Sequence, residues 1–260
     1  MLTGETRLSE TGLDAVALKP AECDVGRAAT LAVDVITIDY EGAEHLPDAE
    51  VLATLTETKE VRLTTPVRAD GFDPLGDDSR YDELPEGIKQ VLVAGHSAYL
   101  TDAERKRPIA PRLSAALAAA PDSWVGTEGI ERIALATGGT QFDLLSRTTR
   151  RDTRALRAAG YDGELAVYAP TVLTDDEDAI LDAVGAYASR RRPVARALPD
   201  GAATDSSATG RARKVLLAAS RDYALVGTPR GVREQIDALR AVGVDTVVGY
   251  PARGIDEFLR

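Results

Sequence analysis

The chain has 260 residues, 44% of them hydrophobic, which is enough apolar material for one large core of the size of a barrel domain. Acidic residues outnumber basic ones by 42 to 31, and the net charge of −11 argues against nucleic acid and anionic lipid as partners. The single cysteine, Cys23, excludes an intramolecular disulfide framework and a cysteine-rich metal site, so we interpret it as a structural or incidental thiol.

The N-terminus and the charge pattern indicate where the protein works. The first ten residues, MLTGETRLSE, lack the basic and apolar regions of a secretory signal, and no stretch reaches the ~18 consecutive apolar residues of a membrane helix. Lysine is scarce and arginine abundant, a pattern that resembles cytosolic proteins of haloarchaea. We therefore expect a cytoplasmic, halophilic, archaeal protein, with an acidic protein from a GC-rich mesophile as the alternative.

Eight short runs rich in Val, Ile, Leu, Thr and Tyr predict β-strands along the chain. They lie at residues 14–19, 33–40, 61–67, 90–96, 132–138, 164–170, 223–227 and 245–250. Ala-rich stretches with helical spacing separate most of these runs, as in repeated strand–helix units. Eight parallel strands are the number that closes a barrel, so the pattern predicts a single (β/α)8 TIM barrel over residues 1–260.

Five stretches between the strands predict helices. Residues 229–242 follow the N-cap Thr228 and end at Gly243, and residues 175–189 follow the N-cap Thr174. The other three helices are predicted at residues 47–58, 112–120 and 142–159.

Two connections have no helical period. Residues 68–88 carry several glycines and prolines and form a long loop, either a lid or a purely structural connection. Residues 198–210 are small and polar and predict an irregular, mobile insertion. Just before this insertion come Arg190, Arg191 and Arg192, which we interpret as the solvated C-terminal end of a helix.

Three stretches carry a resemblance to a known superfamily. They are ETGLDAVAL at residues 10–18, AVYAPTVLTDDEDAI at 166–180 and VGTPRGVREQIDALRAVGVDTVVGY at 226–250. Together they resemble the luciferase-like monooxygenase superfamily of flavin- or F420-dependent barrel enzymes. The resemblance implies an oxidoreductase that binds F420 or FMN at the C-terminal mouth of the barrel and transfers hydride to a small substrate.

Polar residues at the C-terminal ends of the strands are the candidates for chemistry, because barrel enzymes place their reacting groups there. His96 ends the fourth strand and is one of two histidines, which favours acid–base work or a hydrogen bond to a cofactor ring. Asp39 ends the second strand and is the second catalytic candidate. We expect these two residues to orient or protonate the substrate.

The candidate cofactor-binding residues share the same strand ends and the late loops. Backbone N–H groups near glycines can hold phosphate, although the same glycines are equally explained by tight turns. The candidates are Lys19, Arg68, Thr137, Gly138, Gly139, Gly227, Thr228, Tyr250 and Arg253.

Two other functions stay open. Asp39, Glu41 and His45, with His96, have the ligand types of a hard-metal site, which would suit a metal-dependent lyase or isomerase, although we assign no metal ligand. Alternatively, the barrel is a non-catalytic module that binds a ligand or regulates. In each case the expected partner is a small molecule, and the expected assembly is a homodimer.

Overall fold

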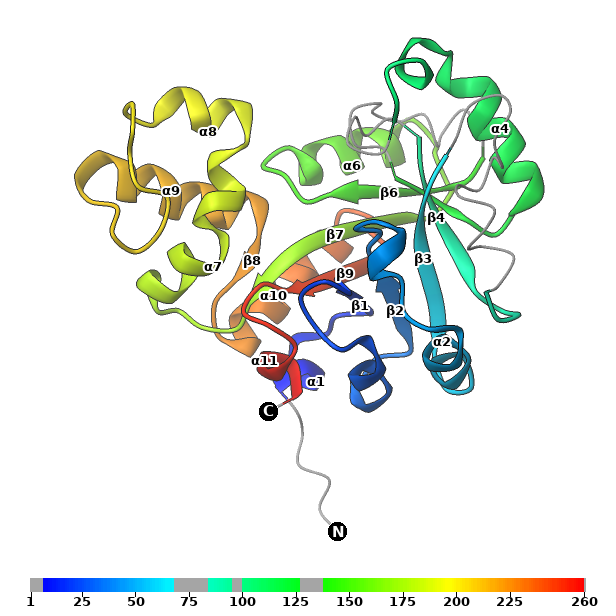
Figure 1. Ribbon diagram of the computed structural model, residues 1–260. Helices are drawn as coiled ribbons and strands as arrows, with labels where there is room; N and C mark the ends of the chain where they lie inside the picture. The colour runs from blue at the N-terminus through cyan, green and yellow to red at the C-terminus, as the bar shows by residue number, and fades with distance from the viewer. Residues whose placement is uncertain (1–6, 68–83, 95–99, 127–137, 260) are drawn as a thin grey trace.

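Eight parallel strands form a closed barrel in the structure, a computed structural model that describes residues 7–67, 84–94, 100–126 and 138–259 (Figure 1). Each strand pairs in parallel with the next, and the last pairs with β1 to close the ring. The prediction of a (β/α)8 barrel is confirmed. The strands of the ring are β1 (Ala15–Leu18), β2 (Val35–Ile38), β3 (Glu60–Pro66), β4 (Lys89–Val93), β5 (Trp124–Gly126), β6 (Thr140–Leu144), β7 (Leu165–Val172) and β9 (Thr246–Pro251).

The ring is not made of the eight strands that the sequence predicted. The run at 223–227 forms only β8 (Leu225–Val226), which pairs with the last two residues of β7 beyond the point where β6 ends. The other edge of β7 pairs with β9, so β8 lies outside the ring. The two extra members are β5 and β6, which were not predicted. Of the predicted strand at 132–138, residues 132–137 lie outside the described residues.

Strand alternation sorts side chains into an inner and an outer core. Val16 and Leu18 of β1 point outward and join the main hydrophobic cluster with the surrounding helices, whereas Ala15 and Ala17 point into the barrel.

The described helices and short 3-10 turns are α1 (Arg7–Thr11), η1 (Val25–Thr30), η2 (Ala43–His45), α2 (Ala49–Thr56), η4 (Glu104–Lys106), α4 (Ile109–Ala119), α6 (Thr149–Ala158), α7 (Glu177–Ser189), α8 (Arg192–Ala197), α9 (Gly210–Tyr223), α10 (Pro229–Arg240) and α11 (Asp256–Leu259).

The helix predictions hold for most elements and need two corrections. Thr228 caps α10 as expected, accepting a hydrogen bond from the backbone N–H of Gly231. The N-cap of α7, however, is Asp176 rather than Thr174, because the Asp176 carboxylate accepts the N–H of Asp178. The predicted helix at 142–159 is also wrong at its start: residues 142–144 belong to β6, and α6 begins only at Thr149.

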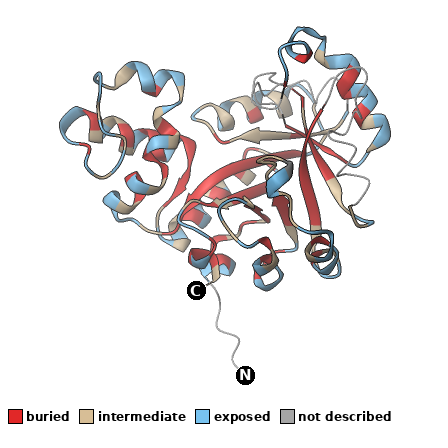
Figure 2. Cartoon of the chain, viewed as in Figure 1, coloured by how far each residue is buried: buried red, intermediate tan, exposed pale blue. Residues whose placement is uncertain are grey.

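A unit of three helices stands to one side of the barrel, between β7 and β8 in the chain (Figure 1). Helices α7, α8 and α9 pack around their own hydrophobic cluster, which includes Leu181, Val194 and Leu216. Buried residues run along the barrel strands and along the facing sides of these helices, and their outer sides are exposed (Figure 2). The sequence predicted neither α8 nor α9, and the irregular segment expected at 198–210 is the connection between them.

The loop expected at 68–88 is described only at its end. Residues 68–83 lie outside the described residues, and Leu84 and Ile88 pack against the main hydrophobic cluster. None of the described helices combines the length and the apolar character needed to cross a membrane.

Candidate functional site

A cavity of about 550 Å³ opens at the C-terminal mouth of the barrel. Its inner wall comes from strand ends, and its outer wall comes from the end of α7 and the residues that join it to α8. The described residues that line it are Lys19, Asp39, Tyr40, Glu41, Thr64, Val93, Gly126, Phe142, Leu144, Tyr168, Tyr187, Arg190 and Arg191. Pockets of this size, partly apolar and with a few convergent polar groups, are typical of small-molecule sites.

Asp39 is the carboxylate at the centre of this mouth. It follows β2, and its backbone N–H continues the parallel ladder by donating to the carbonyl of Leu18. The hydroxyl of Tyr168 donates to Asp39 Oδ2 at 3.2 Å. Burial raises the pKa of Asp39 to about 7, although the charge of Lys19 and the Tyr168 hydrogen bond act to lower it. A carboxyl group with this pKa can hold or release a proton near neutral pH.

Lys19 and Tyr250 close the side of the mouth next to Asp39. The Lys19 ammonium lies 4.5 Å from the centroid of the Tyr250 ring and 3.1 Å from Glu22 Oε1. The Tyr250 hydroxyl donates to the other carboxylate oxygen of Glu22. Burial and this hydrogen bond raise the pKa of Tyr250, so its phenol stays protonated. Lys19 therefore brings a positive charge close to the Asp39 carboxyl group, where it acts to lower that pKa.

Aromatic rings from four strands form a continuous stack through the barrel. Trp124 stacks on Phe142 with ring centroids 5.5 Å apart, and Phe142 meets the edge of Tyr168 at 6.0 Å. Tyr168 in turn stacks on Tyr250 at 6.2 Å. Such contacts fix ring orientations, so the packing of Phe142 and Tyr250 against the Tyr168 ring directs its hydroxyl toward Asp39.

Several predicted cofactor-binding residues lie away from this cavity. Gly138 and Gly139 line a second pocket at the opposite, N-terminal end of the barrel, because they precede β6 instead of ending a strand. Gly227 and Thr228 start α10, and Thr228 is occupied as its N-cap. Arg253 pairs with Glu257 at 3.0 Å in the turn after β9. The described lining of the mouth includes none of these five residues.

Of the other predicted site residues, the structure brings Lys19, Asp39 and Tyr250 together. His96, Arg68 and Thr137 lie outside the described residues, so their predicted roles stay predictions. His45 is exposed on η2, 3.9 Å from Glu44. Among the described residues, no group of three or more His, Cys, Asp or Glu side chains is arranged to hold a metal ion.

Sequence reasoning missed the residues that α7 contributes to the mouth. Tyr187, Arg190 and Arg191 line the cavity, although we had interpreted the arginines as a solvated helix end. Their clustering was visible in the sequence. What was not visible is that α7 ends above the barrel mouth, since this depends on the packing of α7 against α8 and α9.

Comparison with known proteins identifies a family and a fold. A family model described as "Family of unknown function (DUF7388)" matches residues 8–258. No curated protein matches the chain in sequence.

Three solved structures with low sequence identity are similar to the chain. An F420-dependent tetrahydromethanopterin reductase from Methanopyrus kandleri is 14% identical with a TM-score of 0.61, covering 94% of both chains. An F420-dependent secondary alcohol dehydrogenase, in complex with an F420–acetone adduct, is 11% identical with a TM-score of 0.55, covering 94% of this chain and 95% of that one. The monooxygenase RslO1 from Streptomyces bottropensis is 16% identical with a TM-score of 0.52, covering 95% of both. These similarities show the barrel fold that the chain shares with such enzymes.

Proposed function

The chain belongs to this family of unknown function, and we propose that it is an oxidoreductase that binds F420 or FMN at the C-terminal mouth and acts on a small molecule. The observation that carries the proposal is the pairing of a cavity of about 550 Å³ with a protonatable carboxyl group, Asp39, inside it. The shared fold with two F420-dependent enzymes supports the choice of cofactor.

The lining of the cavity fits a planar ring with one polar edge. Val93, Phe142 and Leu144 form an apolar wall, and Lys19 and Asp39 face it from the ends of neighbouring strands. In the same wall, a Cβ at Gly126 would lie 3.1 Å from Val93 Cγ2, so the glycine keeps the wall flat where a side chain would crowd it.

When bound, such a cofactor supplies the hydride acceptor or donor. The protein supplies the proton and the orientation. Asp39 exchanges a proton with the oxygen of a substrate that lies against it, and Tyr168 holds the carboxyl group in place through its hydroxyl. Lys19 stabilises the carboxylate form and lowers the cost of releasing the proton. His96 is proposed as a second acid–base residue from its position in the sequence, and a His96→Ala variant tests that role.

Cofactor titration tests this proposal. We would follow the absorbance of F420 and of FMN as the protein is added in molar KCl, and compare two variants of the same strand. Leu144→Trp fills the mouth, whereas Thr140→Trp puts the same ring at the opposite end of β6. The proposal predicts saturable binding of one cofactor to the parent and to Thr140→Trp, and loss of binding in Leu144→Trp. If the folded parent binds neither cofactor, or if Leu144→Trp binds like the parent, the proposal fails.

A further inference from the structure

The junction between α7 and α8 places positive charge over the mouth, because Arg190 is the C-cap of α7 and Arg191 is the N-cap of α8. Tyr187, Arg190 and Arg191 line the same cavity as Asp39, although they come from a helical unit outside the barrel. This concentration of arginine is notable in a chain with a net charge of −11. The cavity therefore has two chemically different ends, with a protonatable carboxyl group at the strand ends and guanidinium groups at the junction of α7 and α8.

The arginines are held in place by aromatic rings. The Arg191 guanidinium lies 4.4 Å from the ring centroid of Tyr187 and 5.7 Å from that of Tyr223, and it donates a hydrogen bond to the Tyr187 hydroxyl. Arg190 lies 5.9 Å from the same Tyr187 centroid. Because these contacts restrict the long side chains beforehand, a ligand that pairs with them loses less conformational entropy on binding.

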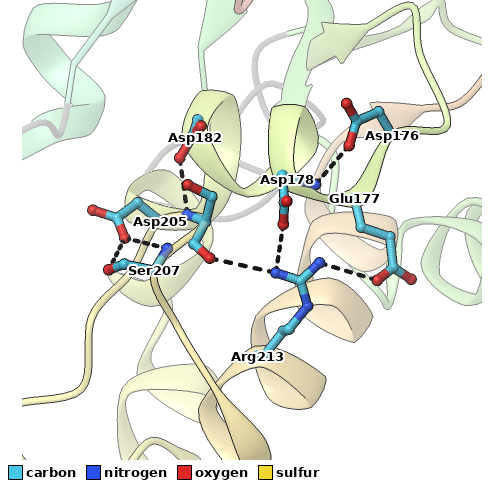
Figure 3. A network of polar contacts seen from close by, with 8 residues as sticks. Asp176, Glu177, Asp178, Asp182, Asp205, Ser207 and Arg213 are labelled. Carbon is cyan, nitrogen blue, oxygen red and sulfur yellow. Dashed lines mark hydrogen bonds and ion pairs between the residues drawn. The ribbon is translucent and has the colours of Figure 1, made fainter.

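Helix α7 is itself fixed against its neighbours, so its arginines have a defined position. Arg213 of α9 reaches the first turn of α7, with its guanidinium nitrogens 3.2 Å from Glu177 Oε2 and 2.7 Å from Asp178 Oδ1 (Figure 3). The same side chain donates to the carbonyl of Ser206, and Asp182 accepts the N–H of that residue (Figure 3). The connection between α8 and α9 is therefore tied to α7.

Close packing reinforces these polar contacts. A Cβ built on Gly185 of α7 would lie only 2.2 Å from the carbonyl oxygen of Thr204, so the connection between α8 and α9 rests directly on the helix. A helix held this closely is a support for specific recognition.

The charges across the cavity favour an anion between them. Among the described residues of the lining, Lys19, Arg190 and Arg191 bring three cations, whereas Asp39 and Glu41 bring two carboxyl groups. Both carboxyl groups follow β2, on the strand side of the mouth. Arg190 and Arg191 both lie over the ring of Tyr187, and an anion that binds between the two guanidinium groups reduces the repulsion of their charges. An oxyanion accepts hydrogen bonds from guanidinium groups in the fork geometry that suits carboxylate and phosphate.

We propose that the substrate is a small carbonyl or hydroxyl compound that carries a carboxylate or phosphate group, and that Arg190 and Arg191 bind this anionic group while Asp39 faces the reacting oxygen. This inference rests on the proposed function, since it names the substrate class of the same site. In this proposal, the unit of α7, α8 and α9 contributes to substrate selection.

The test measures by calorimetry how tightly the protein binds an anionic compound and its neutral analogue, with and without the cofactor that the parent binds. One pair is benzoylformate and its methyl ester, and the other is dihydroxyacetone phosphate and dihydroxyacetone. The double variant Arg190→Gln/Arg191→Gln removes the proposed contacts. Its control, Arg192→Gln/Arg196→Gln, removes two exposed arginines from α8. We expect the parent and the control to bind at least one anion about tenfold more tightly than its neutral partner, and the double variant to lose that preference.

The outcomes separate the two proposals. If the parent prefers the anion but binds no cofactor, the anion site stands and the oxidoreductase proposal fails. If the parent shows no preference in either pair, or the double variant keeps the parent's preference, the substrate proposal is overturned. It is also overturned if the double variant loses cofactor affinity while it still prefers the anion, because the arginines would then hold the cofactor.

Discussion

The two ends of the barrel are built from the same parts and differ in what those parts do. Each end has a cation over an aromatic ring: Arg62 lies 4.2 Å from the Trp124 centroid at the N-terminal end, and Lys19 lies 4.5 Å from Tyr250 at the mouth. Each end also has a carboxyl group whose pKa burial alone would raise. At Glu60 the hydrogen bond from Lys89 and the charge of Arg62 outweigh burial and lower the pKa.

At Asp39 the balance has the opposite sign. Burial outweighs the attraction of Lys19 and the Tyr168 hydrogen bond, and the pKa rises to about 7. The N-terminal end is thus a closed network in which Glu60 accepts from Arg62 at 2.7 Å and from Lys89 at 2.6 Å. At the mouth, the neutral hydroxyl of Tyr168 is the donor to Asp39 among the described residues, and the cavity opens beside this carboxyl group. The difference indicates that the first end stabilises the fold, and it supports the proposal that the second exchanges a proton.

Removal of Arg62 should have the largest effect on stability. Its side chain is only 8% exposed, and it also donates to the carbonyl of Asp122 at 3.0 Å. Arg62→Met removes one donor from Glu60, which keeps Lys89, and one from this carbonyl, so we expect a loss of about 3–5 kcal/mol in the free energy of unfolding, or about 1.5–3 kcal/mol for each charge-assisted hydrogen bond. Chemical denaturation measures it. Arg230→Met is the control, since that side chain is 89% exposed and the expected change is below about 0.5 kcal/mol. A similar cost for both variants would contradict a closed, stabilising N-terminal end.

The Asp39→Asn variant should differ from the parent in a pH-dependent way. The folded protein protonates Asp39 with a pKa of about 7, against 3.8 for an ordinary aspartate. Between these values the folded state holds a proton that the unfolded chain has lost, so the parent loses stability as the pH rises from about 4 to about 7. Asn cannot ionise and escapes this loss. We expect Asp39→Asn to be more stable than the parent by about 2–4 kcal/mol at pH 8 and nearly equal to it at pH 4.

Glu60→Gln should show the reverse dependence. Because the pKa of Glu60 is lowered from 4.5, its ionised form stabilises the fold above that value, and this stabilisation is lost as the pH falls through the folded pKa. The variant should therefore be less stable than the parent at neutral pH, with the difference shrinking in acid. Denaturation curves between pH 3 and 8 check Asp39→Asn and Glu60→Gln. If the stability difference from the parent changes with pH in the same direction for both variants, the contrast between the two ends of the barrel is contradicted.

Sequence reasoning predicted the barrel because most of its strands are local patterns. Six of the eight predicted runs became ring strands, each a continuous stretch of apolar and β-branched residues. Strand β5 has only three residues, too few for a periodic signal, and β6 was hidden in a pattern that also suits a helix. The displacement of β8 depends on how β7 shares its edges with β6 and β9, which is a long-range property.

The candidate site was predictable to the extent that it follows from strand ends. Lys19, Asp39 and Tyr250 came from that rule, and the structure brings them together. The rule failed for Gly138 and Gly139, because they directly precede β6 and so lie at the N-terminal end of a strand. It could not find Arg190 and Arg191, because they approach the mouth from a helix outside the barrel.

The fixed position of α7 over the mouth can be tested with a pair of helical glycines. Gly185→Ala places a Cβ against the carbonyl oxygen of Thr204, so the connection must move. We expect a loss of about 1–3 kcal/mol in stability, as for other overpacked sites. In Gly231→Ala the nearest atom is 3.4 Å away, and the change should stay below about 1 kcal/mol. Thermal denaturation compares the two, and equal stabilities would show that the roof of the mouth is loosely packed.

Salt should have the smallest effect and should act on the exposed charges. With a net charge of −11, screening by molar KCl reduces self-repulsion of the folded chain. We expect the melting temperature to rise by about 2–4 °C, which corresponds to about 1 kcal/mol in the free energy of unfolding. The loss of stability caused by Arg62→Met should not change with salt. A melting temperature that does not change between dilute buffer and molar KCl would remove the basis for a salt-adapted protein.

Direct titration of two carboxyl groups tests the central contrast between the ends of the barrel. Carbon-13 NMR of protein labelled at its carboxyl carbons follows Asp39 and Glu60 from pH 2 to 9, with Asp39→Asn and Glu60→Gln to assign the signals. We predict a midpoint of about 7 for Asp39 and one below 4.5 for Glu60. An Asp39 midpoint near the ordinary value of 3.8 would contradict the account, because Asp39 would then be ionised at neutral pH and could not donate the proton as proposed.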